Sequence, residues 1–473
     1  MVFSSTVFLF LFLPLVILIS LIPNRRIQNG WLLIASLVFY WWGGPSYLII
    51  LLSSLGINYV AGLAMHHFKS AQKPILALAI AVNLGILGVF KYANFFIENL
   101  NNALSAFKLN SIEHEQIMLP IGISFFTFQA ISYLVDLYRK EVEVQRNFFD
   151  LALYISLFPQ LIAGPIIRYH DVDQQLKNRT RSAEKFILGI ERFVIGLSKK
   201  ILVANTFAAV SDEIFELPPN DITTSLAVVA TVAYTFHIYF DFAAYSDMAI
   251  GLGRLFGFEF KENFNFPYVA KSIQEFWRRW HISLSSWFRD YLYIPLGGNR
   301  VGNSRLYVNL FIVFLCTGFW HGASWNFVIW GLFHGLFLVV ERVSLGKTLE
   351  KLKVLNKLYV LLVVMTGWIF FKAETLEMAW KVTQEFYGIF SLDFSWTEVA
   401  IYFQNDFILC LIIGFASMLG YTEKLHAWAA SYFKDNTIGH WHGIRYMVLM
   451  GLLFMCMAYM SANTYSPFIY FRF

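Results

Sequence analysis

Apolar segments long enough to cross a bilayer recur along the chain, and this pattern constrains its fold more than any other feature. Hydrophobic residues make up 58% of the 473 residues and charged residues only 14%, whereas soluble domains carry about 25% charged residues. A helix needs roughly 20 apolar residues to span the hydrocarbon core. We therefore predict an all-α polytopic membrane protein with about 11 transmembrane helices, plus re-entrant and in-plane amphipathic helices. The apolar segments are 2–21, 30–43, 46–64, 75–97, 118–137, 147–165, 186–210, 223–250, 307–320, 323–340, 355–371, 403–420 and 444–461.

Neither an internal repeat nor a separable soluble domain interrupts this series, so residues 1–473 are predicted to form a single transmembrane domain. The first segment has no basic start and no small-residue cleavage site before Arg25, and we interpret it as a retained helix rather than a signal peptide. Basic loops belong inside, which places the N-terminus outside. The three cysteines lack motif spacing and argue against a disulfide framework and against a zinc site.

Two histidines lie in otherwise apolar, aromatic surroundings. His281 follows Arg278-Arg279-Trp280, and His321 follows Trp320 and precedes Gly322. An ionisable side chain inside a bilayer costs of the order of several kcal/mol unless it lines a cavity or finds a partner. Imidazole is also well suited to moving a proton near neutral pH. The pattern indicates proton-transfer chemistry within a membrane, and the alternative for each residue is a buried, hydrogen-bonded core histidine.

Two segments break the alternation of basic and acidic loops. Segment 147–165 has basic loops on both sides and ends with Pro159 and Gly164, which predicts a broken, re-entrant element beside a protein-lined cavity. Basic residues also flank 307–340. At 1.5 Å per residue, 307–320 reaches only about 21 Å, short of a bilayer core of about 30 Å. We therefore expect His321 at the tip of a hairpin within the membrane.

The segment 260–300 mixes charged residues with many aromatic residues. It is too charged to span a bilayer and too aromatic for an ordinary loop. We predict short amphipathic helices in or under the cytoplasmic leaflet, supporting His281. The alternative is a plain membrane-surface anchor.

These motifs in combination resemble the membrane-bound O-acyltransferase family. The closest similarity is to its branch of alginate and peptidoglycan O-acetylation proteins, with the D-alanine transferase of teichoic acids as a cousin. The resemblance covers nearly the whole chain in order. His237 departs from it, because glutamine is more usual at that position. The residues that carry the resemblance are Arg278 to Tyr291, Ile294 to Gly298, Phe319 to Gly322, Met118 to Phe128, Ala163 to Pro165, Tyr239 to Met248 and Trp368 to Glu374.

The resemblance implies a central tunnel that joins a cytoplasmic donor to an acceptor on the outer face, with His321 as the catalytic residue and His281 as the second histidine. Trp320, Trp325, His334 and Arg289 are expected to bind substrate, and His334 lines the cavity or supports it. The chain contains no Gly-x-Ser-x-Gly or His-Glu-x-x-His motif. It therefore offers a base without an evident nucleophile, which favours direct attack by an acceptor hydroxyl with His321 as general base.

The C-terminal residues 462–473 are rich in aromatic side chains and include Tyr470. This segment resembles an extracytoplasmic tail, found in this branch or in its partner peptides, whose tyrosine is proposed to accept the acyl group. A phenol has a pKa near 10, so its ester transfers an acyl group far more readily than an alkyl ester does. The alternative is an aromatic belt at the membrane interface.

The resemblance implies a membrane O-acetyltransferase in the bacterial cytoplasmic membrane, contacting membrane lipids and no nucleic acid. It would move acetyl groups from a cytoplasmic thioester, acetyl-coenzyme A, toward an extracytoplasmic polysaccharide, peptidoglycan or alginate. No permanently bound cofactor or metal is expected, and the implied partner is an extracytoplasmic SGNH-esterase-like acetyltransferase. Two alternatives remain: a protein or lipid acyltransferase of the same fold, and a transporter without catalysis.

Overall fold

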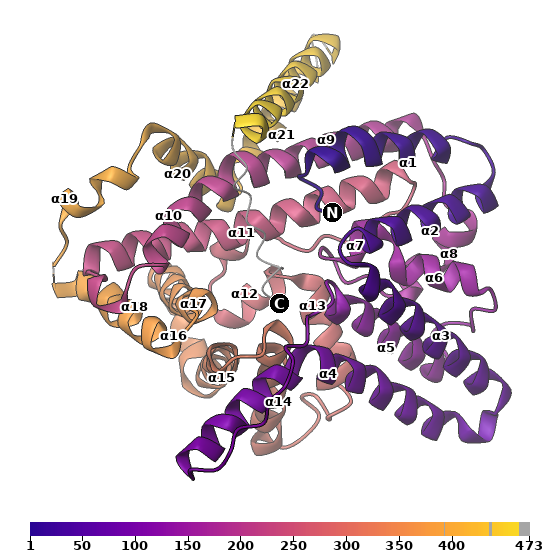
Figure 1. Cartoon of the computed structure of the whole chain (residues 1–473). Helices are drawn as coiled ribbons and strands as arrows, with labels where there is room; N and C mark the ends of the chain where they lie inside the picture. The colour runs from indigo at the N-terminus through magenta and orange to yellow at the C-terminus, as the bar shows by residue number, and fades with distance from the viewer. Residues whose placement is uncertain (392, 435–437, 463–473) are drawn as a thin grey trace.

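The structure is a computed structural model that describes residues 1–391, 393–434 and 438–462. Its elements are helices (Figure 1), and no β-strand occurs within these ranges, which confirms the all-α prediction. The first half contains α1 (Leu13–Ser20), α2 (Arg25–Trp41), α3 (Pro45–His67), α4 (Gln72–Ala106), α5 (Ile123–Arg139), α6 (Phe148–Ser156), α7 (Phe158–Leu161), α8 (Tyr169–Asn178), α9 (Ala183–Ser198), α10 (Asn205–Phe215) and α11 (Thr224–Leu255). The second half contains α12 (Ile273–Arg279), α13 (Ile282–Phe288), α14 (Asn303–His321), α15 (Trp325–Val340), α16 (Gly346–Lys351), α17 (Leu355–Lys372), α18 (Leu376–Gly388), α19 (Trp396–Val399), α20 (Asn405–Met418), α21 (Tyr421–Lys434) and α22 (Ile438–Ala462).

Short 3-10 and π-helical turns join or extend these helices. The π-helical turns are η1 (Phe8–Phe12), η3 (Lys199–Ala204), η6 (Arg289–Tyr293) and η7 (Glu341–Leu345). The 3-10 turns are η2 (Lys69–Ala71), η4 (Pro219–Asp221), η5 (Pro267–Val269), η8 (Ile389–Ser391) and η9 (Ala400–Tyr402).

Helix α11 forms the centre of the fold and is buried along most of its length. In Figure 1, α2, α3, α5, α6 and α8 lie on one side of it and α15 to α18 on the other. It packs closely on α9 because glycines face its backbone: a Cβ on Gly196 would lie 2.7 Å from the carbonyl oxygen of Ala244. Lys200 and Asp241 form a buried ion pair of 2.6 Å beside it. Charges at membrane depth need such partners.

Among the described residues, seven helices are long and apolar enough to cross a membrane, or eight if a pair bent by 87° is one span. The chain is therefore a multi-pass membrane protein. The number is lower than the predicted 11 or so because several apolar segments form shorter helices, such as α2 and α5 with 17 residues each. The spans are Pro45–His67, Lys69–Ala106, Ala183–Phe215, Thr224–Leu255, Trp325–Leu345, Leu355–Lys372 and His442–Ala462, with Trp396–Tyr402 and Asn405–Met418 as the bent pair.

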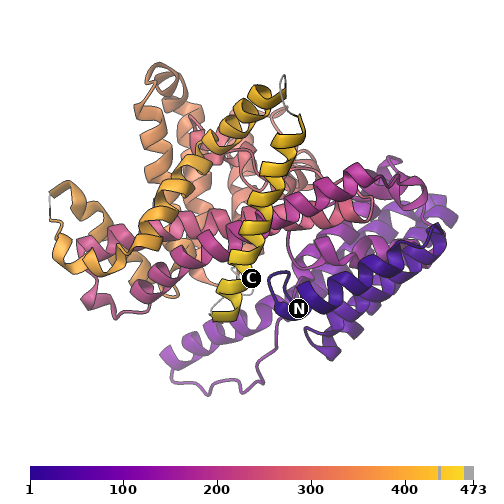
Figure 2. The same ribbon diagram turned by 90° about the horizontal axis from the view of Figure 1, so that it is seen from above.

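Helix α4 is the longest helix among the described residues and extends beyond the others. Its 35 residues correspond to about 52 Å, against a bilayer core of about 30 Å. Seen from above (Figure 2), its far end and the loop that follows project from the body of the molecule. Its middle packs on α3 and α5.

The break predicted in 147–165 is present. Helix α6 ends after nine residues, and α7 starts anew with Pro159 in its first turn, where a missing N–H costs nothing. Gly164 then turns the chain with a φ of +107°. Residues 151–167 are buried throughout, so this irregular backbone is covered by protein, as membrane depth requires.

The hairpin predicted for 307–340 is formed by α14 and α15, which pack against each other. Two glycines allow the contact: a Cβ on Gly318 would lie 2.3 Å from the Phe327 carbonyl oxygen, and one on Gly331 would lie 2.3 Å from that of Phe314. Helix α14 begins at Asn303, before the predicted segment, so its 19 residues extend about 28 Å rather than 21 Å. His321 is its last residue.

The segment 260–300 contains the short helices predicted for it, namely α12 and α13 with the turns η5 and η6. Ser272 caps α12 by accepting a hydrogen bond from the Glu275 backbone N–H. Helix α12 ends at Arg279, and α13 starts directly after His281, whose left-handed backbone conformation, with a φ of +44°, makes the turn between them. This turn positions His281.

Candidate active site

His281 lies in the turn between α12 and α13 and is buried. Its Nδ1 lies 3.2 Å from Oδ1 of Asn263, and the same oxygen accepts the backbone N–H of Ser283 at 3.2 Å. Because a backbone N–H only donates, the shared atom must be the amide oxygen. His281 Nδ1 therefore carries the proton, and Nε2 carries the lone pair. Within the described residues this Nε2 has no hydrogen-bond partner.

Asn263 in turn connects His281 to the central helix. Its Nδ2 donates to Oγ of Ser246 on α11 at 3.1 Å, and its backbone oxygen accepts the N–H of Ile282 at 2.9 Å. Phe242 of α11 meets the imidazole edge-on, with ring centroids 4.5 Å apart. The ring of His281 is thus fixed by hydrogen bonds on one side and by an aromatic face on another.

His321 ends α14 and is buried among aromatic rings from three helices. Its ring centroid lies 4.9 Å from that of Trp320, 5.0 Å from that of Trp330 on α15, and 5.0 Å from that of Phe371 on α17. All three contacts are edge-on. Such packing restricts the orientation of the imidazole.

The two histidines line the same cavity, which has a volume of about 1320 Å³. The ring of Trp320 lies near both, with centroids 6.1 Å from His281 and 4.9 Å from His321. Other lining residues, such as Arg278 and Arg342, are exposed. The cavity therefore connects the molecular surface with two buried imidazoles that lie 40 positions apart in the sequence.

The exposed part of the cavity is rich in cations, namely Lys271, Arg278, Arg289 and Arg342. Two of the three lining carboxylates are engaged: Glu341 accepts the backbone N–H groups of Ile273 at 2.6 Å and Gln274 at 3.1 Å, and Glu275 pairs with Arg279 at 2.8 Å. The third, Glu350, is exposed, so cations outnumber the remaining carboxylate. Lys271, Arg278 and Arg342 form no ion pair within the described part of the chain. This rim suits an anionic ligand.

The four residues expected to bind substrate do not all line this cavity. Arg289 lines the cavity, whereas Trp320, Trp325 and His334 are not among its lining residues. Trp325 is exposed and donates to Asn99 on α4 at 2.9 Å. His334 is fully buried, 5.0 Å from the ring of Trp277. A substrate contact of these residues stays a prediction, and Tyr470 lies outside the described residues.

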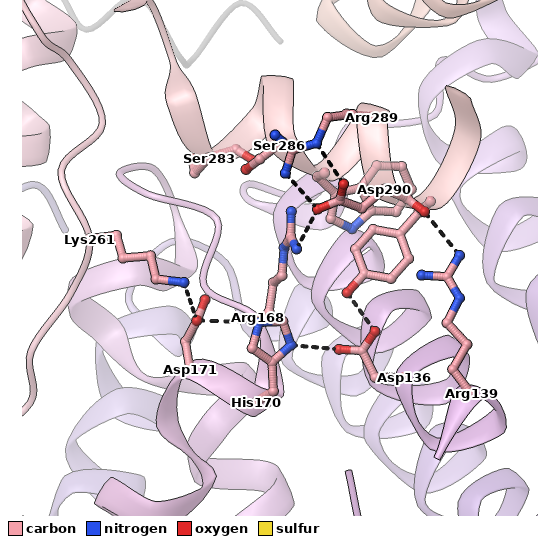
Figure 3. A network of polar contacts seen from close by, with 12 residues as sticks. Asp136, Arg139, Arg168, His170, Asp171, Lys261, Ser283, Ser286, Arg289 and Asp290 are labelled. Atoms are coloured by element: carbon pink, nitrogen blue, oxygen red, sulfur yellow. Dashed lines mark hydrogen bonds and ion pairs between the residues drawn. The ribbon is translucent and has the colours of Figure 1, made fainter. Parts of the chain in front are cut away.

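A polar network holds the segment that follows α13 (Figure 3). Asp136 of α5 accepts from Tyr291 at 2.7 Å and pairs with His170 of α8 at 3.0 Å, while Arg168 pairs with Asp290 at 2.8 Å. The Asp136 contact raises the pKa of His170 to about 9, with a further contribution from Asp171. Burial raises the pKa of Asp171, but hydrogen bonds from His170 and Lys261 outweigh it and lower the pKa to about 2.

This network also contains the described residues best placed to hold a metal. Asp136, Glu141 and His170 bring one ligand atom each within 4.8 Å of one another. Both carboxylate oxygens of Asp136, however, are already hydrogen-bonded, one to Tyr291 and the other to His170. We therefore interpret these residues as part of a structural hydrogen-bond and ion-pair network that anchors η6, rather than as a metal site.

Replacing His170 with alanine is expected to lower the thermal unfolding temperature at neutral pH. The pKa of His170 is raised in the folded protein to about 9, so its stabilising contribution is complete below the ordinary pKa of about 6.5 and is lost as the pH rises through 9. Thermal unfolding of the wild type and His170→Ala at about pH 6 and about pH 10 measures this. A difference between the two proteins that stays constant with pH would contradict the ion pairing.

Sequence reasoning missed two residues that contact this site. Lys91 is the single charged residue in the apolar segment 75–97, a signal that could have drawn attention to it. It donates to the backbone oxygen of Trp320, next to His321. Asn263 lies in a polar stretch without any local signal, and its importance follows only from its contact with His281.

Comparisons with known proteins cover the part of the chain that forms this site. Residues 126–348 match the membrane-bound O-acyltransferase family, MBOAT. A probable alginate O-acetylase of Pseudomonas putida is 41% identical over the whole of both chains. The peptidoglycan O-acetyltransferase of Helicobacter pylori is 38% identical over 82% of this chain and 80% of its own length. The teichoic acid D-alanyltransferase of Bacillus subtilis is 30% identical over 46% of this chain and 58% of its own. Both histidine motifs fall within the matched range, and the chain belongs to the membrane-bound O-acyltransferase family.

Proposed function

We propose that this protein transfers an acetyl group from a cytoplasmic thioester to a hydroxyl group, for O-acetylation of an extracytoplasmic polysaccharide. The observation that carries the proposal is the cavity that His281 and His321 share. It connects a cationic surface with two imidazoles, one of which has its lone pair directed away from its fixed hydrogen bond. That arrangement suits acid–base chemistry on a substrate that enters from the rim.

In the proposed reaction, His321 acts as general base. The acceptor hydroxyl gives its proton to the imidazole as its oxygen attacks the thioester carbonyl, and the C–S bond then breaks. The departing thiolate takes up the proton, which balances the transfer. Nε2 of His281 can accept a hydrogen bond because Nδ1 already donates to Asn263, and it orients a different N–H or O–H group of the bound substrates, since the single proton of the attacking hydroxyl goes to His321.

The proposed donor is acetyl-coenzyme A, whose phosphates suit the cationic rim. Arginine binds phosphate groups through paired N–H donors, and Arg278 and Arg342 lack ion-pair partners within the described residues. Because basic surfaces of membrane proteins face the cytoplasm, the rim would face the compartment that holds the donor. The volume of about 1320 Å³ exceeds the roughly 300–1,000 Å³ of most ligand pockets, as a long donor requires.

The polysaccharide that finally accepts the acetyl group is inferred from the names of similar proteins. The similar proteins of Pseudomonas putida and Helicobacter pylori are named for alginate and peptidoglycan acetylation, and we propose one of these polysaccharides as the final acceptor. The protein would then lie in the bacterial cytoplasmic membrane. An extracytoplasmic partner, an SGNH-esterase-like acetyltransferase, would pass the acetyl group from this protein to the polysaccharide.

The experiment that tests the function supplies the purified protein with acetyl-coenzyme A labelled in the acetyl group. Release of coenzyme A, with label on a protein hydroxyl or an added glycan, supports the proposal. Label recovered in lipid instead points to a lipid acyltransferase. An intact donor that crosses proteoliposome membranes points to a transporter, and both of these results would overturn the proposal.

We propose Tyr470 as the first acceptor of the acetyl group. Replacing it with phenylalanine is expected to remove label from the C-terminal peptide and to stop glycan acetylation in cells. The exchange deletes the phenol oxygen and leaves the aromatic ring, so an interfacial belt would be preserved. Mass spectrometry of the C-terminal peptide measures the acetyl group. Normal glycan acetylation in the Tyr470→Phe variant counts against the relay, and Tyr465→Phe provides a matched control in the same tail.

A further inference from the structure

Lys91 is a buried, positively charged residue near His321, and it has no part in the reaction proposed above. It lies on α4 and is only 7% exposed. Its Nζ donates to the backbone oxygen of Trp320 and to Oγ of Ser124 at 3.2 Å, and it lies 5.7 Å from the centre of the Trp320 ring. A lysine at this depth is costly unless it has a function or a partner.

The next residue on α4 makes a parallel contact. The hydroxyl of Tyr92 donates to the backbone oxygen of Phe319 at 2.6 Å. Phe319 and Trp320 belong to the last turn of α14, where the carbonyl groups have no intrahelical partners. Neighbouring side chains of α4 thus bind neighbouring carbonyls at the helix end that carries His321.

The two contacts differ in charge. The C-terminal end of a helix carries a negative pole of about half an elementary charge, and α14 directs this pole at the position of His321. Lys91 brings a positive charge to it and forms no ion pair with a carboxylate within the described residues. The negative pole would oppose the negative charge that develops on the carbonyl oxygen during acyl transfer, and an ammonium group beside it offsets that effect.

We propose that Lys91 is a positioning residue for His321, which holds the end of α14 and offsets the negative pole of that helix beside the reacting atoms. The inference rests on the proposed role of His321. Ser124 couples this contact to α5, and it lies in the stretch Met118 to Phe128, to which the reaction assigns no other part. Lys91 does not line the cavity, so it acts through α14 rather than by binding the donor.

The test compares Lys91→Met with Tyr92→Phe in the purified full-length protein, with acetyl-coenzyme A as donor. Lys91→Met is expected to lower kcat by about 10- to 100-fold, because a charged hydrogen bond is lost. Tyr92→Phe removes a neutral hydrogen bond and should lower kcat by less than about 10-fold. The KM for acetyl-coenzyme A should change less than about two-fold in both. An equal kcat loss in the two variants, or a loss expressed in KM, would overturn the proposal.

Two further variants cover the case in which Lys91→Met does not fold. Lys91→Arg keeps the charge, and Lys91→Gln keeps a donor without charge. We expect arginine to retain more of kcat than glutamine, and glutamine matching arginine would refute the electrostatic role. His321→Ala is measured in parallel. Activity in His321→Ala would refute the proposed function itself, whereas an inactive His321→Ala beside a fully active Lys91→Met would refute only the role of Lys91.

Discussion

Replacement of His321 by alanine is expected to abolish measurable acyl transfer while the protein still inserts and folds. General acid–base catalysis typically contributes about 10²- to 10⁴-fold to the rate, and a loss toward the upper end of that range leaves no measurable turnover. The imidazole is packed edge-on by Trp320, Trp330 and Phe371. These three large rings remain in the variant, so the loss of the imidazole leaves a small cavity and the helices around it are expected to stay packed. Release of coenzyme A from acetyl-coenzyme A by the purified variant measures the loss.

A matched control for this variant is His237→Gln. His237 is also buried, on α11, but it does not line the cavity. The family resemblance makes glutamine the more usual residue there, so this exchange should leave kcat within about two-fold. Comparable losses in the two variants would mean that His321 contributes to folding rather than to chemistry.

Replacement of His281 by asparagine should be the second most damaging change, with kcat lower by about 10²-fold. The amide nitrogen of asparagine takes the position of Nδ1 and can still donate to Asn263, and asparagine tolerates the φ of +44°, so the turn between α12 and α13 is expected to persist. The lone pair of Nε2 in the cavity, however, disappears. Steady-state kinetics with acetyl-coenzyme A measures the effect, which should fall on kcat rather than on KM.

Variants of Asn263 test whether the orientation of the His281 ring matters for catalysis, because they leave His281 itself in place. Asn263→Asp keeps an oxygen that accepts the Nδ1 proton and should retain kcat within about 10-fold. Asn263→Leu removes that oxygen, releases the ring from one tautomer, and should cost about 10- to 100-fold. Equal activity in the aspartate and leucine variants would contradict the tautomer assignment of His281.

The features that could be predicted from the sequence are those encoded locally. The apolar segments predicted the all-α membrane fold, Pro159 and Gly164 predicted the broken element of α6 and α7, and the charged aromatic stretch predicted the short helices around His281. Each of these depends on residues that are neighbours in the chain. Backbone chemistry alone, through proline and glycine, decides much of their form.

The features that could not be predicted arise from packing between distant segments. Lys91 contacts a carbonyl 229 positions away, and Asn263 acquires its role only because the turn after α12 folds back on it. Helix α14 starts at Asn303, directly after its N-cap residue Gly302, although the apolar segment begins later in the sequence. The polar residues of its first turn are compatible with a helix, so the hydrophobic pattern does not reveal where the helix starts. The distribution of exposed cations along one cavity likewise depends on how α12, α13 and η7 come together.

The central claim is that a thioester on the cytoplasmic side reaches His321 and delivers its acyl group to the opposite face. Inside-out membrane vesicles that contain the protein, supplied externally with acetyl-coenzyme A labelled in the acetyl group, test this directly. We expect labelled ester in the lumen for the wild type and none for His321→Ala, and right-side-out vesicles should acquire no label. Equal labelling of vesicles of both orientations, or luminal label with His321→Ala, would contradict the account.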